Sequence, residues 1–219
     1  MAKKQEILYT PPNEGFWTIS GVNYRGETET YRLFKKMTPA MTQDHLSEFY
    51  GQEKAKGNPR PMNSVLHFAI MNASYNLRNK NLKETERLRR FLQAGFQEYP
   101  HTLTSVIYSP SGEDRIVHNH RTPDEFYIDA HVVGPDGWMK EIKDKKILES
   151  LLGTQDVVQI DKVSQWINRT NSFIWRLNSK PEQKHERVAG FGAGNGRLCF
   201  LCGGVPFGEY PAFRVLRVD

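Results

Sequence analysis

Cysteine and long apolar runs are both scarce in this sequence. Only 2 cysteines occur among 219 residues, and they lie close together, so a disulfide framework is excluded. No apolar run approaches the roughly 20 residues that a membrane-spanning helix needs. Only a short apolar patch follows residues 1–5, so we expect no signal peptide and, by default, a cytoplasmic location.

A strong charge excess, internal repeats and low-complexity tracts are also missing. The 30 Lys and Arg residues exceed the 25 Asp and Glu residues by 5, and the basic side chains are scattered among acidic ones. No long basic run exists to follow a phosphate backbone, so nucleic acid is not an expected partner. A chain of 219 residues with 38% hydrophobic residues is typical of one globular domain, which we place over residues 1–219.

The first half of the chain shows strand and helix periods in turn. Residues 16–20 and 28–34 are predicted strands around a glycine-containing turn. Three helices are expected after them, at residues 42–56, 63–78 and 83–99. The apolar stripe of the second helix is wide, which indicates that this helix is buried.

The second half carries most of the predicted strands. The expected elements are a hairpin from 102–109 and 115–118, a strand at 126–133, a helix at 138–152 closed by Gly153, a strand at 157–160, a short helix capped by Asp161, and a strand at 172–178. Helices that precede strands without regular alternation favour an α+β fold. Its expected core residues include Trp166, Trp175 and Phe213.

The last part of the chain lacks many residue types. From Val188 onward it contains no Lys, Gln, Met, Trp, His, Ser, Thr or Ile, although all of these occur in the preceding chain. An alternating strand at 197–202 is followed by a loop of glycines and prolines at 203–211 and a closing strand at 212–218. Apolar residues in this loop have no periodic neighbour to pack against, which is the layout of a binding surface.

The alternation of the strand at 197–202 divides its side chains between two faces. Arg197, Cys199 and Leu201 share one face, and the residues between them share the other. Because a charged Arg is rarely buried without a partner, we expect its face to meet solvent.

The ending PAFRVLRV, after a Gly-rich turn, a short strand and a loop, carries a resemblance to a known family. It resembles the close of C-type-lectin-like domains of the formylglycine-generating-enzyme type. It is most similar to the variable proteins of diversity-generating retroelements, in particular the archaeal kind. The likeness is specific over roughly the last third of the chain.

The resemblance implies a C-type-lectin-like fold with antiparallel sheets, N-terminal helices, paired first and last strands, and termini close together. Residues 1–159 would be scaffold, and residues 160–219 would be a lectin-like core with a hypervariable region at about 188–211. In this family a reverse transcriptase misreads template adenines. Rewriting an AAC codon in this way never yields Lys, Gln, Glu, Met or Trp, and Glu209 is the one departure.

The implied function is ligand binding without catalysis or cofactor, with a protein as the partner. The expected ligand-binding positions are Gly190, Gly192, Asn195, Cys199, Leu201, Gly203, Gly204, Val205, Phe207, Gly208 and Tyr210. We expect these positions to be exposed and tolerant of substitution. The positions expected to resist change are Leu198, Phe200, Pro206, Pro211 and Phe213.

Two other functions remain open at this point. The first is a metal-dependent hydrolase or nuclease that uses the densest group of potential ligands, which comprises His118, Asn119, His120, Asp124, Glu125, Asp129 and His131. Their spacing matches no ligand pattern, so solvated loop histidines are the simpler interpretation. The second is a nucleic-acid-binding module that uses the small basic excess.

Two short motifs in the last part of the chain carry little weight. Cys199 and Cys202 would point to opposite faces of a strand, which disfavours a zinc or redox pair. The glycines of residues 190–196 precede a strand rather than a helix N-terminus, which argues against a phosphate loop.

Overall fold

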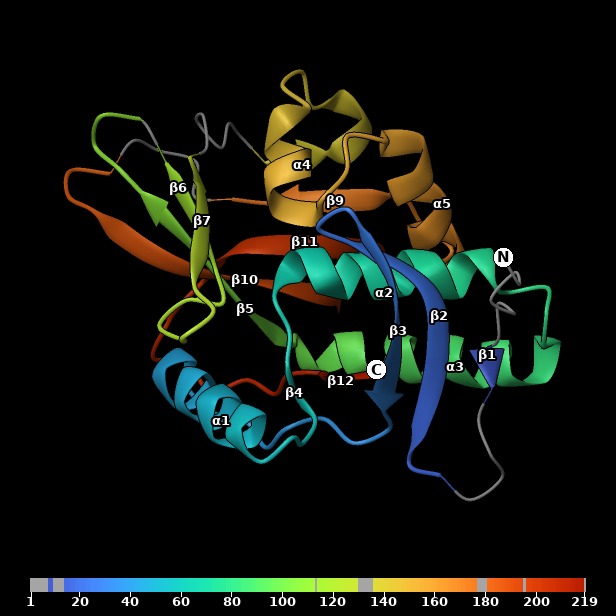
Figure 1. Cartoon of the computed structure of the whole chain (residues 1–219). Coiled ribbons are helices and arrows are strands. Elements are labelled where there is room, and N and C mark those ends of the chain that lie inside the picture. Colours follow the sequence, from blue (N-terminus) through green and yellow to red (C-terminus); the bar gives the residue numbers. More distant parts are fainter. Residues whose placement is uncertain are drawn as a thin grey trace.

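The helix α2 (Ser64–Asn76) lies between two β-sheets (Figure 1). The computed structural model describes residues 8–9, 14–112, 114–129, 136–176, 181–194 and 196–218. Helix α2 contacts strand β2 (Phe16–Tyr24) of one sheet and strand β5 (His101–Tyr108) of the other. The chain is therefore mixed α+β, with a helix at its centre that is buried on nearly every side, as its wide apolar stripe predicts.

The smaller sheet joins the beginning and the end of the described chain. Its strand order is β1 (Leu8–Tyr9), β2, β3 (Glu27–Phe34), β12 (Arg214–Val218) and β4 (Arg60–Pro61). Strand β12 pairs antiparallel with β3, and Val218 lies opposite Thr30. The expectation that the N-terminal strands and the closing strand share one antiparallel sheet is confirmed.

The larger sheet has seven strands in the order β7-β6-β5-β10-β11-β9-β8. Besides β5, this sheet contains β6 (Arg115–His118), β7 (Phe126–Asp129), β8 (Gly137–Trp138), β9 (Ser172–Trp175), β10 (His185–Gly194) and β11 (Arg197–Gly204). The predicted hairpin of β5 and β6 is confirmed. The expectation of purely antiparallel sheets is wrong here. Strand β11 lies between β10 and β9, and it pairs antiparallel with β10 but parallel with β9.

Three helices follow the first strands where the sequence predicts them. They are α1 (Gln43–Ala55), α2 and α3 (Leu82–Gly95), and the short 3-10 turn η1 (Phe96–Glu98) continues α3. Each helix begins after a polar side chain, at Thr42, Asn63 and Asn81, that accepts a hydrogen bond from a first-turn amide. These caps satisfy amides that have no partner within the helix, which explains why the starts were predictable.

The region from 138 to 160 differs from its predicted structure. In place of one helix at 138–152 there are the 3-10 turn η2 (Met139–Glu141) and α4 (Lys146–Leu152), which ends at Gly153 with φ 75° as expected. The predicted strand at 157–160 is instead the first turn of α5 (Val157–Asn168).

Two aspartates explain why the strand prediction failed. Asp156 caps α5 by accepting a hydrogen bond from the amide of Gln159 at 2.9 Å, so the β-branched residues that follow are helical. Asp161 lies inside α5 and caps nothing there. Its carboxylate accepts a hydrogen bond from the amide of Ser172 at the start of β9, at 2.9 Å.

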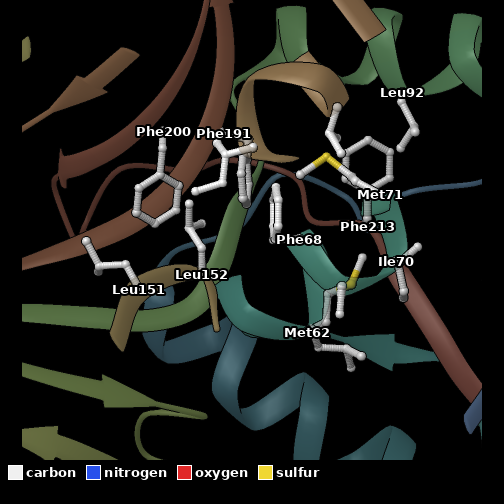
Figure 2. Close-up of a cluster of buried hydrophobic side chains, with 14 of the residues drawn as sticks. Met62, Phe68, Ile70, Met71, Leu92, Leu151, Leu152, Phe191, Phe200 and Phe213 are labelled. Carbon is white, nitrogen blue, oxygen red and sulfur yellow. The ribbon is translucent and has the colours of Figure 1, made fainter. Parts of the chain in front are cut away.

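In the core, aromatic side chains of the larger sheet and Phe213, which directly precedes β12 of the smaller sheet, pack around α2 (Figure 2). Phe191, Phe200 and Phe213 are 4%, 1% and 1% exposed, which confirms Phe213 as a core residue. Trp166 is half-buried and packs against the core from outside. Trp175 is 43% exposed, so its assignment to the core is wrong. Among the described residues, no helix has both the length and the apolar composition to cross a bilayer.

Candidate ligand-binding surface

The strands β10 and β11 form a hairpin inside the larger sheet. The directly opposite pairs are Gly190 with Leu201, Gly192 with Cys199, and Gly194 with Arg197. Between these positions on β11, the side chains of Leu198, Phe200 and Cys202 are 4%, 1% and 0% exposed and face the core. The glycines, Arg197, Cys199 and Leu201 therefore share the opposite face of the sheet, as the alternation predicts.

Aromatic side chains from β9 and β8 extend that face. In the parallel pair, Cys199 lies beside Phe173 and Leu201 lies beside Trp175. Trp138 on β8 lies beside Phe173 in turn. The ring centroids of Trp138 and Phe173 are 5.3 Å apart, and those of Phe173 and Trp175 are 5.4 Å apart. The three rings form a continuous row along the sheet.

The guanidinium group of Arg197 covers one end of this row. Its Cζ lies 5.1 Å from the ring centroid of Trp138 and 4.6 Å from that of Phe173. Attraction between a cation and an aromatic face explains why a charged side chain shares this face with apolar ones. We call the following set the outer aromatic face: Trp138, Phe173, Trp175, Arg197, Cys199 and Leu201.

Tyr99 covers the glycine strand beside the outer aromatic face. It follows η1 with φ 51°, and 42% of the residue is exposed. A Cβ on Gly192 would lie 2.6 Å from the Tyr99 ring, and a Cβ on Gly194 would lie 2.8 Å from its hydroxyl oxygen. The tyrosine ring therefore fills the space that side chains at these two glycines would need.

Three of the predicted binding positions, Gly190, Gly192 and Cys199, are buried rather than exposed. A Cβ on Gly190 would lie 2.7 Å from the backbone oxygen of Pro100, which cannot move aside as a flexible side chain can. Cys199 is 6% exposed, and the indole Nε1 of Trp175 donates a hydrogen bond to its Sγ at 3.2 Å. The expectation of exposure is wrong at these positions because neighbours far away in sequence cover them.

The end of β11 and the loop after it supply the exposed positions. Gly203 and Phe207 are exposed, Phe207 to 79%, and a Cβ on Gly203 would meet no heavy atom within 4 Å. The half-buried positions are Leu201, Gly204, Val205, Gly208 and Tyr210. The expected exposure is thus confirmed for Gly203 and Phe207, and the five half-buried positions are partly exposed. Asn195 lies outside the described residues.

The backbone of this loop is held against the start of α1. The amide of Gln43 donates to the oxygen of Pro206 at 2.9 Å, and Met41 and Tyr210 exchange backbone hydrogen bonds of 3.2 and 3.1 Å. The ring of Tyr210 stacks on His101 with centroids 4.2 Å apart. A side chain at the loop tip, such as that of Phe207, is therefore presented on a fixed backbone, which limits the entropy lost on binding.

The two thiols do not form a reactive pair. Cys199 belongs to the outer aromatic face, whereas Cys202 points into the core and is fully buried. Burial raises the pKa of the Cys199 thiol, although Trp175 and Arg197 oppose this shift. Burial also raises the pKa of the Cys202 thiol. Both groups therefore remain neutral thiols near neutral pH. Their side chains lie on opposite faces of β11, as the alternation predicts.

The residues proposed as a metal site are directed to different partners. His118 is fully buried, with Nδ1 2.9 Å from Thr104 Oγ1 and Nε2 2.8 Å from the oxygen of Ser150. Burial lowers its pKa to about 4. Asp124 accepts hydrogen bonds from Tyr50 and Lys54, both at 2.6 Å. His118 and Asp124 therefore bond to separate partners and do not converge on one metal position.

His120 belongs to a third group. Its Nδ1 lies 2.9 Å from Glu125 and its Nε2 lies 3.2 Å from Glu186. Although burial opposes the shift, the two carboxylates raise the pKa of His120. His131 and the side chain of Asp129 lie outside the described part of the chain. Within the described part, no three His, Cys, Asp or Glu side chains are grouped closely enough to hold a metal ion.

Sequence reasoning missed Tyr99 and Trp138 as surface residues and placed Trp175 in the core. A local signal was present for β9, because Phe173 and Trp175 alternate with Ile174 and so share one face of the strand. Which face meets solvent depends on the pairing of β9 with β11, and this pairing joins distant parts of the chain.

Comparisons with known protein families, with curated proteins and with solved structures found no match to this chain. The interpretation of the surface therefore depends on its own residues and geometry.

The β10–β11 hairpin offers a matched test of these contacts. Gly190→Ala is expected to lower the free energy of unfolding by about 1–3 kcal/mol, because its methyl group would overlap the Pro100 carbonyl. Gly203→Ala, on β11 with open space around it, is expected to change it by less than about 0.5 kcal/mol. Denaturant unfolding measures both values. Equal losses would contradict the assignment of Gly190 as a structural glycine.

Proposed function

We propose that this protein is a C-type-lectin-like variable protein that binds a protein ligand without catalysing a reaction. Its recognition surface comprises the outer aromatic face and the segment of residues 203–210, which is the end of β11 and the loop after it. The sequence likeness to retroelement variable proteins motivates the proposal. The observation that carries it is the gathering of large aromatic side chains and an arginine on the outer face of the larger sheet, beside a rigidly held loop. Phe173 in this row is only 8% exposed, so Trp175 and, in the loop, Phe207 supply the accessible aromatic area.

The chemistry of this surface suits protein recognition. Aromatic residues and Arg are enriched where protein interfaces gain most of their binding free energy. Trp175 and Phe207 each present a large exposed apolar area, at 43% and 79% exposure. Arg197 adds a charged group that is already positioned by two rings, so little side-chain freedom is lost on binding.

Burial excludes several of the predicted ligand-binding positions from the residues that can vary. Gly190, Gly192 and Cys199 are covered by other residues, and a Cβ on Gly204 would lie 2.8 Å from the backbone oxygen of Val188. The variable set that we propose therefore centres on four positions with accessible side chains or open space: Leu201, Gly203, Val205 and Phe207.

Two libraries of equal size test this assignment. One varies Leu201, Gly203, Val205 and Phe207, and the other varies Gly190, Gly192, Cys199 and Gly204, with the residues that mutation of an AAC codon can give. We expect most members of the first library to stay folded and few of the second, because exposed substitutions cost little stability and overpacking costs more. Resistance to a protease measures the folded fraction.

The first library also tests recognition. Selection against a purified test protein is expected to enrich particular residues at the four varied positions, and binding of the selected clones is expected to weaken with Trp175→Ala. If the two libraries lose folded members equally often, or if the folded clones of the first yield no binders, the proposed surface is wrong.

The genome provides an independent test of the retroelement part of the proposal. We expect a near-copy of the DNA that encodes residues 188–211, differing at adenines, beside a reverse-transcriptase gene. The differing codons should include those for Leu201, Gly203, Val205 and Phe207 and spare those for Leu198 and Phe200. Absence of the copy, or differences concentrated in the core codons, would count against it.

A further inference from the structure

A polar cleft lies between the turn of the β2–β3 hairpin, α1, β4 and β12, and it shares no residue with the proposed recognition surface. Its volume is about 390 Å³, within the range of small-ligand sites. Three tyrosines, three arginines, three carboxylates and two asparagines line it. What such a cleft can bind depends on which of these groups already have partners within the protein.

Two of the three carboxylates are occupied. Glu29 accepts a hydrogen bond from the Tyr31 hydroxyl at 2.6 Å and forms an ion pair with Arg217 at 2.6 Å. Asp124 is held in the same way by Tyr50 and by Lys54. Their negative charges are therefore compensated locally and oppose an anionic ligand less than a free carboxylate would.

Two of the three guanidinium groups lack such a partner. Within the described part of the chain, neither Arg25 nor Arg60 forms an ion pair with a carboxylate. Arg25 lies over the ring of Phe126 with its Cζ 4.3 Å from the centroid, and Arg60 lies over the ring of Tyr50 at 5.6 Å. Arg60 also donates a hydrogen bond to the Tyr50 hydroxyl oxygen and lies near the Asp124 carboxylate. Each guanidinium group has five N–H donors, so further donors remain for a ligand.

The hydroxyl group of Tyr24 is a neutral donor at the wall of the same cleft, and Asn63 fixes its role. Asn63 is 1% exposed, and its Nδ2 donates to the Tyr24 hydroxyl oxygen at 2.8 Å and to Asn119 Oδ1 at 3.0 Å. Its Oδ1 accepts from the amide of Leu66, which fixes the orientation of the side-chain amide. The Tyr24 oxygen is thus an acceptor for Asn63, and its own O–H has no acceptor among the described residues.

We propose that this cleft binds a small anion through a carboxylate or phosphate group, with Arg25 and Arg60 as charged donors and Tyr24 as a neutral donor. Of the lining charges without an ion pair in the described part of the chain, those of Arg25 and Arg60 are positive and only one is negative, and a guanidinium group matches the paired oxygens of both anions. Glu27 is the one lining carboxylate without an ion pair in the described part of the chain, and it is exposed. Its charge opposes that of the ligand and limits the affinity.

Calorimetric titration of the full chain at low ionic strength tests the proposal, with inorganic phosphate in one arm and citrate in the other. We expect saturable binding at one site in at least one arm. Arg25→Gln and Arg60→Gln should each weaken it about ten-fold, which corresponds to about 1.4 kcal/mol, and Tyr24→Phe should weaken it less. Glu27→Gln should strengthen it, a change opposite in sign that general loss of structure cannot produce.

Arg115 provides the matched control. It is an exposed arginine on β6 whose Cζ lies 3.7 Å from the ring centroid of Tyr127, away from the cleft. Arg115→Gln should leave the affinity unchanged. Thermal unfolding measures whether each variant is folded. Because Arg25 is exposed in a turn, Arg25→Gln is expected to fold, and it decides the outcome even if Arg60→Gln does not fold.

The two arms separate the possible sources of the anion. Binding of phosphate alone points to a phosphate ester, and binding of citrate alone points to a carboxylic acid. The proposal is overturned if neither anion binds saturably, if Arg115→Gln weakens binding as much as Arg25→Gln, or if Glu27→Gln also weakens it.

Discussion

Replacing Phe213 by Ala is expected to lower the free energy of unfolding by about 3–5 kcal/mol. The residue is 1% exposed, and its ring centroid lies 5.1 Å from that of His67, 5.4 Å from that of Phe91 and 5.8 Å from that of Phe96. Removal of the ring leaves a cavity where the start of β12 meets α2 and α3 (Figure 2). Surrounding side chains refill such a space only in part. Urea unfolding at neutral pH measures the loss.

Trp175→Ala is the control for this substitution. It removes a larger side chain, but the residue is 43% exposed and belongs to the outer aromatic face. We expect a loss of about 1 kcal/mol or less, since the substitution removes one hydrogen bond to Cys199 and little buried area. A loss at Trp175 as large as that at Phe213 would show that the indole belongs to the core after all.

Local chemistry made several elements predictable from the sequence. Thr42 and Asn63 begin helices because their side chains satisfy free amides, and Gly153 ends one because it adopts a positive φ. The error at residues 157–160 shows the limit of this reasoning. β-branched residues favour strands, but the cap at Asp156 and the burial of Ile160 against the core determine a helix.

Contacts between distant segments determined the parts of the surface that could not be predicted. Alternation correctly divided β11 into two faces, but it gave no indication that Tyr99 would cover Gly192 or that the Pro100 carbonyl would exclude a side chain at Gly190. Both contacts depend on the register of β10 beside β5.

The polar cleft could not be predicted at all. Arg25, Arg60 and Arg217 are far apart along the chain, and nothing in the local sequence around any of them indicates a shared site. They line one cleft because β12 returns to lie between β3 and β4.

Lowering the pH from 7 to 5 is expected to reduce the free energy of unfolding by several kcal/mol, a large part of the stability of a typical domain. Three buried histidines cause the loss. Burial lowers the pKa of His67 to about 3 and that of His101 and His118 to about 4, from an ordinary value of about 6.5.

The sign follows from proton uptake in the two states. Between pH 6.5 and 4 the three histidines bind protons in the unfolded chain but not in the folded chain. Their contribution to stability is therefore fully present above pH 6.5 and is lost as the pH falls. Each histidine contributes about 2 kcal/mol at pH 5. His120 acts in the opposite direction, because Glu186 and Glu125 outweigh burial and raise its pKa. Carboxylates with lowered pKa values, such as Glu186, add to the loss only at lower pH.

Denaturant unfolding at pH 7, 6 and 5 measures this slope, and two variants at buried positions identify its source. His67→Leu removes a buried titrating group that lies 4.4 Å from Phe191 by ring centroids, so the slope between pH 6 and 5 should fall by about a third. Phe96→Leu, at a buried position whose ring centroid lies 5.8 Å from that of His67, removes no titrating group and should leave the slope unchanged. A stability that stays constant from pH 7 to 5, or an equal change of slope in both variants, would show that the buried histidines are not the cause.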